Sequence, residues 1–191
     1  MRSMDSEDVE QAAAEMVRVL TPHESRDWQA PAGSLEWSCW TAAAHVAHDL
    51  LAYAGQVAAA QGSAYLPFDL VVRADVSPRD VLQVVIASGR LLSSALAAAA
   101  PDARAWHWGP TDPGGFAALG VNEILVHTYD ITQGLGIGWR PPGSLCAGVL
   151  ARLFPDAPDG DPVQVLLWST GRAELDGRPR VTSWIPRAAL D

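Results

Sequence analysis

Glu123 and His127 lie four residues apart within residues 114–136, a stretch whose apolar spacing and closing glycines predict a helix. On a helix of about 3.6 residues per turn, such side chains stand one above the other and can reach a single ion. Their apolar neighbours predict burial, and a buried carboxylate must find a partner or lose its charge. A divalent cation is one such partner. An ion pair between the two residues, or with an arginine, explains the spacing equally well.

A third ligand is needed, because a catalytic zinc site takes three protein ligands and leaves one position open for water or substrate. Histidines are the natural source, and two of them, His45 and His48, lie on one predicted helix. Helical periodicity places His45 beside Asp49 and away from the apolar face that carries Leu50 and Ala54. This pattern alone favours an exposed His45, so it does not identify the third ligand.

Helical periodicity dominates the rest of the chain and predicts the elements that must position these residues. The clearest helix start is Ser77-Pro78-Arg79-Asp80, which supplies an N-cap, a proline in the first turn and an acidic residue after it. Four long helices, with a long connection between the second and third, predict a mainly all-α fold: an up-and-down four-helix bundle with extra short helices. The helices are expected at residues 5–20, 37–60 (or 40–60), 77–100 and 114–136, with short ones at 144–154 and 163–170.

The chain has 191 residues, enough to bury a core, and we expect a single domain over residues 1–191. Within it, residues 68–73 could form a strand or an extended linker, and residues 178–184 a short C-terminal strand. Two cysteines without C-x-x-C spacing are too few for a disulfide framework, which fits a reducing compartment.

The charge of the chain excludes several classes of partner. A net charge of -9 and a pI near 4.9 disfavour binding to nucleic acid, whose phosphates would be repelled. All 13 basic residues are arginine, which excludes Schiff-base chemistry at lysine. The N-terminus lacks the apolar segment of a signal peptide, and Asp49 and Arg90 interrupt the longest apolar runs. We therefore expect a cytoplasmic protein without a membrane partner.

Three segments of the sequence resemble those of a known family. Residues 35–47 (LEWSCWTAAAHVA), with Trp37 eight positions before His45, resemble the metal-ligand helix of the DinB-like superfamily. More closely, they resemble the N-terminal domain of mycothiol-dependent maleylpyruvate isomerase. Residues 115–136 (GFAALGVNEILVHTYDITQGLG) resemble that family's glutamate-x-x-x-histidine helix, and residues 166–172 (LLWSTGR) resemble its C-terminal signature.

The resemblance implies that His45, Glu123 and His127 hold one metal ion in the bundle, with His48 as a neighbour and not a ligand. It also implies zinc, or another divalent metal, and the thiol mycothiol as a cofactor or co-substrate. Zinc held by these ligands would deprotonate a bound thiol or water near neutral pH. We therefore expect thiol addition to a small electrophile, by a thiol transferase or an isomerase-like enzyme.

Two aspartates follow the ligand histidines by about one turn: Asp49 follows His45 and Asp130 follows His127. Carboxylates often hold the outer nitrogen of a metal-binding imidazole, so both could orient the ligands. Each could equally be a solvated surface acid.

The sequence departs from the isomerase in its length. The isomerase carries an additional C-terminal domain beside its cleft, whereas this chain ends at Asp191. We therefore expect a thiol S-transferase, or a metal-dependent tailoring enzyme that activates water, in preference to maleylpyruvate isomerisation. The alternative is a non-catalytic bundle that binds a small molecule. The bundle faces could also support a homodimer.

Overall fold

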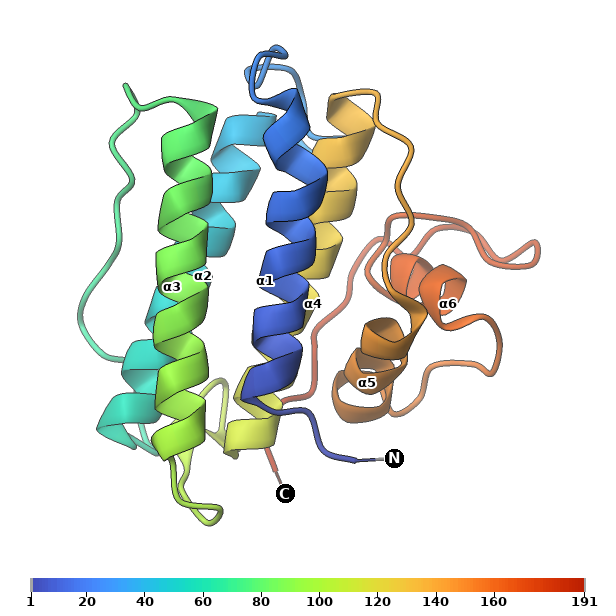
Figure 1. Ribbon diagram of the computed structural model, residues 1–191. Coiled ribbons are helices and arrows are strands. Elements are labelled where there is room, and N and C mark those ends of the chain that lie inside the picture. Colours follow the sequence, from blue (N-terminus) through green and yellow to red (C-terminus); the bar gives the residue numbers. More distant parts are fainter. Residues whose placement is uncertain (1, 191) are drawn as a thin grey trace.

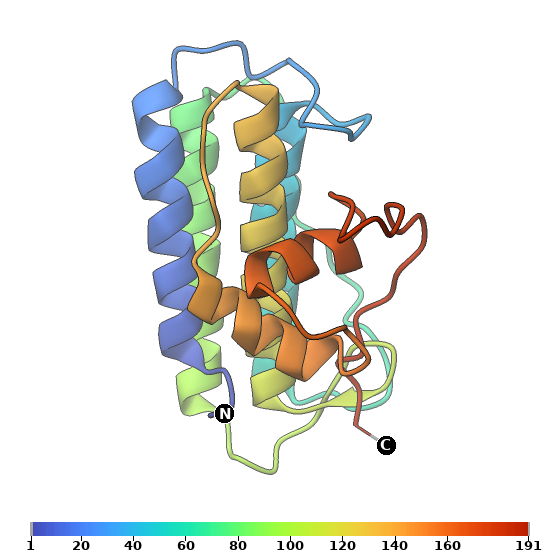
Figure 2. The same ribbon diagram turned by 90° about the vertical axis from the view of Figure 1, so that its right-hand side faces the viewer.

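Four long helices form the body of the protein in the computed structural model, which describes residues 2–190 (Figure 1). Two shorter helices, α5 and α6, lie on one side of the bundle, where α5 packs on α4 and α6 packs on α5 (Figure 2). The predicted mainly helical bundle with extra short helices is confirmed. The helices are α1 Ser6–Leu20, α2 Cys39–Ala59, α3 Pro78–Ala98, α4 Pro113–Gly134, α5 Gly143–Leu153 and α6 Pro162–Ser169, with a 3-10 turn, η1, at Thr21–His23.

The second and third helices run in the same direction, so the bundle does not alternate strictly up and down (Figure 1). The indole of Trp40, at the start of α2, donates a hydrogen bond of 3.1 Å to the carbonyl of Val76, just before α3. A helix of 21 residues is about 30 Å long, and residues 60–77 are enough to return over that distance. The long connection is therefore a crossover, and its residues 68–73 form an extended linker without strand pairing.

The described residues contain one small sheet, an antiparallel hairpin between α3 and α4. It pairs β1 (Ala105–Trp106) with β2 (Pro110–Thr111). The predicted strand at residues 178–184 is wrong, because that segment has no neighbouring strand edge to pair with and Pro179 lacks an N–H donor. Its first residue, Arg178, forms an isolated bridge with Leu175.

Side-chain caps fix where the first and third helices begin. Asp5 caps α1 and Ser77 caps α3, and each completes a reciprocal capping box, with Asp8 and Asp80 respectively. The predicted starts of both helices are therefore confirmed. At the other end of α2, the chain turns at Ala60 in the left-handed conformation (φ 48°), the residue at which the helix was expected to end.

Close packing around Gly120 brings α4 against the other helices. A Cβ atom at this position would lie 2.7 Å from Cδ2 of Leu92 and 3.2 Å from Cδ2 of Leu50, so no larger residue fits without displacement. Leu50, on α2, and Leu92, on α3, are both fully buried. Glu123 lies about one turn after Gly120 on α4. The close approach of α4 to α2 at Gly120 therefore sets how near the side chain of Glu123 lies to side chains of α2.

Among the described residues, α3 is the one helix long and apolar enough, by length and composition, to cross a membrane. Core helices of soluble proteins pass the same test. Here Val81, Val85 and Leu92 of α3 are buried within the bundle. The cytoplasmic location predicted from the sequence remains a prediction.

Candidate metal centre

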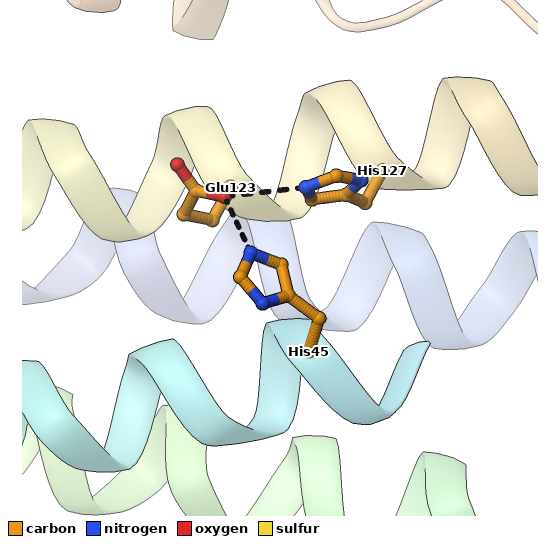
Figure 3. A group of neighbouring side chains, drawn as sticks. All are labelled: His45, Glu123 and His127. Carbon is orange, nitrogen blue, oxygen red and sulfur yellow. Dashed lines mark ion pairs between the residues drawn. The ribbon is translucent and has the colours of Figure 1, made fainter. Parts of the chain in front are cut away.

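His45 on α2 and the pair Glu123 and His127 on α4 converge in the bundle (Figure 3). The Nε2 atom of His45 lies 3.6 Å from Oε2 of Glu123, and Nε2 of His127 lies 3.3 Å from the same oxygen. One donor atom from each of the three residues lies within 4.8 Å of the other two. Residues 78 positions apart in the sequence therefore share one small volume.

The arrangement of the three donor atoms suits one small cation. Bonds of about 2.0–2.1 Å to a tetrahedral ion place its ligand atoms about 3.4 Å apart, close to the two distances from Glu123. Two imidazoles and one carboxylate are a ligand set found in catalytic zinc sites. The side chain of His45 is 30% exposed, whereas that of His127 is 8% exposed, so the centre is open toward solvent on the side of His45.

In the structure without an ion, the carboxylate of Glu123 contacts both histidines. Burial opposes ionisation of Glu123, but contacts from His127 and His45 outweigh it and hold the pKa of Glu123 well below its usual range. Burial likewise opposes charging of His127, but Asp130 and Glu123 raise the pKa of His127 to about 9. Metal-free His127 is therefore protonated at neutral pH, and an incoming cation must displace that proton.

Asp130 lies behind His127, on the side of the ring away from Glu123. Its Oδ2 atom is 3.1 Å from Nδ1 of His127, an ion-pair contact. Arg172 donates to both oxygens of Asp130, from Nε at 3.2 Å and from Nη2 at 2.8 Å. Burial opposes this charge, but His127 and Arg172 outweigh it and lower the pKa of Asp130. This is the position from which a carboxylate can orient a metal-binding imidazole.

Asp49 occupies a different position relative to its histidine. Its Oδ2 atom lies 3.4 Å from Nε2 of His45, the nitrogen that also faces Glu123. Tyr53, a buried residue, donates its hydroxyl to the same oxygen at 3.4 Å. Burial, and then the charge of Glu123, raises the pKa of Asp49. Asp49 therefore lies on the side of His45 that faces Glu123, where an ion would bind. It does not contact Nδ1 of His45, the nitrogen that an orienting carboxylate was expected to hold.

A cleft of about 430 Å³ opens beside the three donor atoms. The indole of Trp37 lies beside the imidazoles of both candidate ligands and is tilted against each, with ring centroids 4.8 Å from His45 and 5.9 Å from His127. On another wall, the guanidinium of Arg172 lies over the ring of Trp184, 5.7 Å from its centroid. Apart from the three ligands, the cleft is lined by Leu35, Glu36, Trp37, Asp49, Arg172 and Trp184.

Comparison with known proteins identifies the helical part of the chain. Residues 9–132 match the sequence model of the mycothiol maleylpyruvate isomerase N-terminal domain, a family of the DinB-like superfamily. The chain belongs to this family. Searches of the curated proteins and of the solved structures return no match.

The isomerase N-terminal-domain match includes His45, Glu123 and His127 but ends before Arg172 and Trp184. The three candidate ligands therefore come from the part of the chain that matches the family, whereas one wall of the cleft comes from the segment that follows. Sequence reasoning did not select Arg172 or Trp184 as site residues. Arg172 could have been found, because it closes the LLWSTGR segment, but no pattern marks Trp184.

His48 is turned away from the three donor atoms. Its Nδ1 atom contacts Oδ1 of Asp69 at 2.8 Å, and its Nε2 atom lies 3.6 Å from Oδ1 of Asp49. Asp69 belongs to the crossover between α2 and α3, and its side chain is 72% exposed. His48 thus links the crossover to α2 beside the metal centre.

Proposed function

We propose that this protein is a metal-dependent enzyme that activates a thiol for addition to a small electrophile, as an S-transferase or an isomerase-like enzyme. The observation that supports this most directly is the convergence of His45, Glu123 and His127, with donor atoms within 4.8 Å of one another. Membership of a mycothiol-related family supports mycothiol as the thiol. Zinc is the metal that the ligand set favours.

A bound zinc ion would supply a Lewis acid that lowers the pKa of a thiol or water at its open position. The residues around it have distinct tasks. Glu123 provides the negative charge that holds the cation between two neutral imidazoles. Asp130 and Arg172 fix the ring of His127 from behind, so that its Nε2 atom points at Glu123. The adjoining cleft holds the electrophile beside the open position.

The test begins with protein purified without added metal. We expect about one zinc ion per chain, and we expect His127→Ala to lose it. His23→Ala is the matched control, because His23 lies in η1 outside the centre and should leave the metal content unchanged. Full metal retention by His127→Ala would refute the ligand assignment.

Activity is measured by incubating the zinc protein with mycothiol and a panel of electrophiles and detecting adducts by mass spectrometry. Adduct formation should stop with a chelator and return when zinc is restored. Metal-dependent hydrolysis without adducts would indicate that water is the activated group. A protein that forms no adduct, yet melts at a higher temperature with a metabolite, would be a binding bundle and not an enzyme.

A further inference from the structure

The outer faces of α1 and α3 lie side by side, and no other described segment covers them (Figure 1). The two helices are antiparallel, because Ser93 on α3 donates to the carbonyl of Ser6 at the start of α1, whereas Gly89 approaches Ala13 further along. The other two long helices are covered, since the crossover packs on α2 at Gly55 and α5 packs on α4. One face of the bundle is therefore free to meet a partner.

A groove of about 540 Å³ runs between α1 and α3. Small residues line it, namely Ala13 and Ala14 on α1 and Gly89 on α3, together with the larger apolar side chains of Val17 and Ile86. Less than half of the most apolar stretch of α3 is buried within the bundle. An apolar groove of this size with charged residues at its edges is typical of an interaction surface.

Charges of opposite sign lie at equal distances from Ala14, which is exposed on α1. Glu10 precedes Ala14 by four residues and Arg18 follows it by four, and all three line the groove. Arg18 donates to Glu15 from Nε and Nη2, and Glu10 accepts from the hydroxyl of Ser93 at Oε1. Within residues 2–190, Nη1 of Arg18 and Oε2 of Glu10 have no hydrogen-bond partner, so both groups can take one from another molecule.

This pattern of charge along α1 is complementary to itself. In a dimer with two-fold symmetry, residue i of one copy contacts residue j of the other, and j contacts i. Two copies of α1 that cross antiparallel at Ala14 would each place Glu10 beside the partner's Arg18, which gives two ion pairs. The small side chain of Ala14 lets the helices approach closely at the crossing. A parallel crossing would instead bring like charges together.

We propose that the α1–α3 face is the interface of a homodimer, in which α1 of each copy lies in the groove of the other. The helices have 15 and 21 residues, so the face measures about 25 Å by about 20 Å. The dimer would then bury on the order of 1,000 Å², the lower end for a specific interface, and we expect a dissociation constant in the micromolar range.

The proposed interface is separate from the candidate metal centre. His45 and Glu123 belong to α2 and α4, which lie behind α3 and α1 in the view of Figure 1. The cleft is lined from α2, α4 and the segments beside them, and it shares no residue with the groove. Both clefts of the dimer would therefore stay open to ligands, and the inference does not depend on the proposed function.

Sedimentation equilibrium of the full-length protein, from about 1 µM to about 500 µM, tests the dimer. The apparent mass should rise from the 20.3 kDa of one chain toward twice that value. Ala14→Glu places a long charged side chain at the crossing and should weaken association at least about tenfold. Ala14→Ser, which is nearly the same size, should retain the dimer. Ala14 is exposed, so neither variant should disturb the fold, and circular dichroism verifies this.

Charge reversal tests the pairing of Glu10 with Arg18 between copies. Glu10→Arg and Arg18→Glu should each weaken self-association at least about tenfold, because each sets like charges opposite one another twice. An equimolar mixture of these two variants should regain the dimer, since every pair in the mixed dimer is again of opposite charge. Glu174→Arg makes the same change in charge beyond α6, outside the groove, and should leave the dimer unchanged.

A wild-type chain that stays monomeric at about 500 µM would overturn the proposal. A dimer that is insensitive to Ala14→Glu would refute this face as the interface, and a mixture of the two charge variants that stays monomeric would refute the antiparallel pairing. A monomer that sediments with lipid vesicles would assign the apolar face to a membrane and would also overturn the proposal. Failure of the proposed function would instead appear as a protein without zinc or without thiol adducts, whatever its state of association.

Discussion

Arg172 holds both carboxylate oxygens of Asp130, a residue 42 positions earlier in the chain, at 3.2 and 2.8 Å. Asp130 in turn faces the outer nitrogen of His127. The segment after α6 therefore supports a candidate metal ligand in α4 through one buried ion pair. The candidate metal centre is therefore supported in part by residues outside the four-helix bundle.

Arg172→Gln should weaken zinc binding by about 10–100-fold, because Asp130 would lose the partner that fixes its orientation toward His127. The dissociation constant is measured by competition with a chromophoric chelator. Arg180→Gln is the matched control, since Arg180 lies on the same segment but donates to Ser34 and not to Asp130. Equal affinities in the two variants would argue against this support.

Zinc binding at neutral pH should release a proton from His127, whose pKa is raised to about 9 in the metal-free protein. Calorimetric titrations in buffers of different ionisation enthalpy measure the number of protons released. The apparent affinity should rise with pH and level off above about pH 9. An affinity independent of pH between 6.5 and 9 would contradict the protonated state of His127.

The stability of the metal-free protein should decrease as the pH rises from 6.5 to 9. The folded-state pKa of His127 is raised above its ordinary value, so its ion pairs stabilise the fold fully below pH 6.5 and are lost as the pH passes 9. Urea unfolding at several pH values measures this trend. The zinc-loaded protein and His127→Gln should both lack the His127 contribution, because neither contains a protonated imidazole at this position.

Gly134→Ala should destabilise the protein by about 1–3 kcal/mol through overpacking at the end of α4. The added Cβ atom would collide with the carbonyl oxygen of Pro31 and lie 2.6 Å from the sulfur of Cys39. Gly138→Ala is the control, because a Cβ atom there meets nothing within 4 Å. Thermal or urea unfolding distinguishes them, and equal stabilities would contradict the tight contact.

Both cysteines should resist alkylation in the folded protein at pH 8. Burial raises the pKa of Cys39 to about 11 and that of Cys146 to about 12, so little thiolate forms. Labelling with iodoacetamide, followed by mass spectrometry, should show modification only after denaturation. Rapid labelling of Cys39 in the native state would show that it is a reactive thiol and would complicate thiol-transfer assays.

The helices were predictable because their signals are local. Capping residues such as Asp5 and Ser77, and the apolar spacing between them, act within a few turns of chain. The direction of α3 relative to α2 was not predictable in this way, because it depends on where the crossover packs. The hairpin around His107 was also missed, since each of its strands has only two residues.

The candidate metal centre, too, was predictable only in part. The i,i+4 spacing singled out Glu123 and His127 as a candidate pair because both lie on one helix, although an ion pair explained the spacing equally well. Periodicity favoured an exposed His45, since it measures how apolar a helix face is and not which polar group it meets. In the structure that face meets Glu123 of α4, so a partly exposed side chain still reaches the other two. Only the family resemblance named all three together.

Trp184 reaches the cleft from a segment without helix or strand, beyond the region that matches the family. A substitution at Trp184 itself would change this wall of the cleft without replacing any of the donor groups of His45, Glu123 and His127. The wall at Trp184 and the three donor groups thus lie in separate stretches of sequence, so each can be varied without the other.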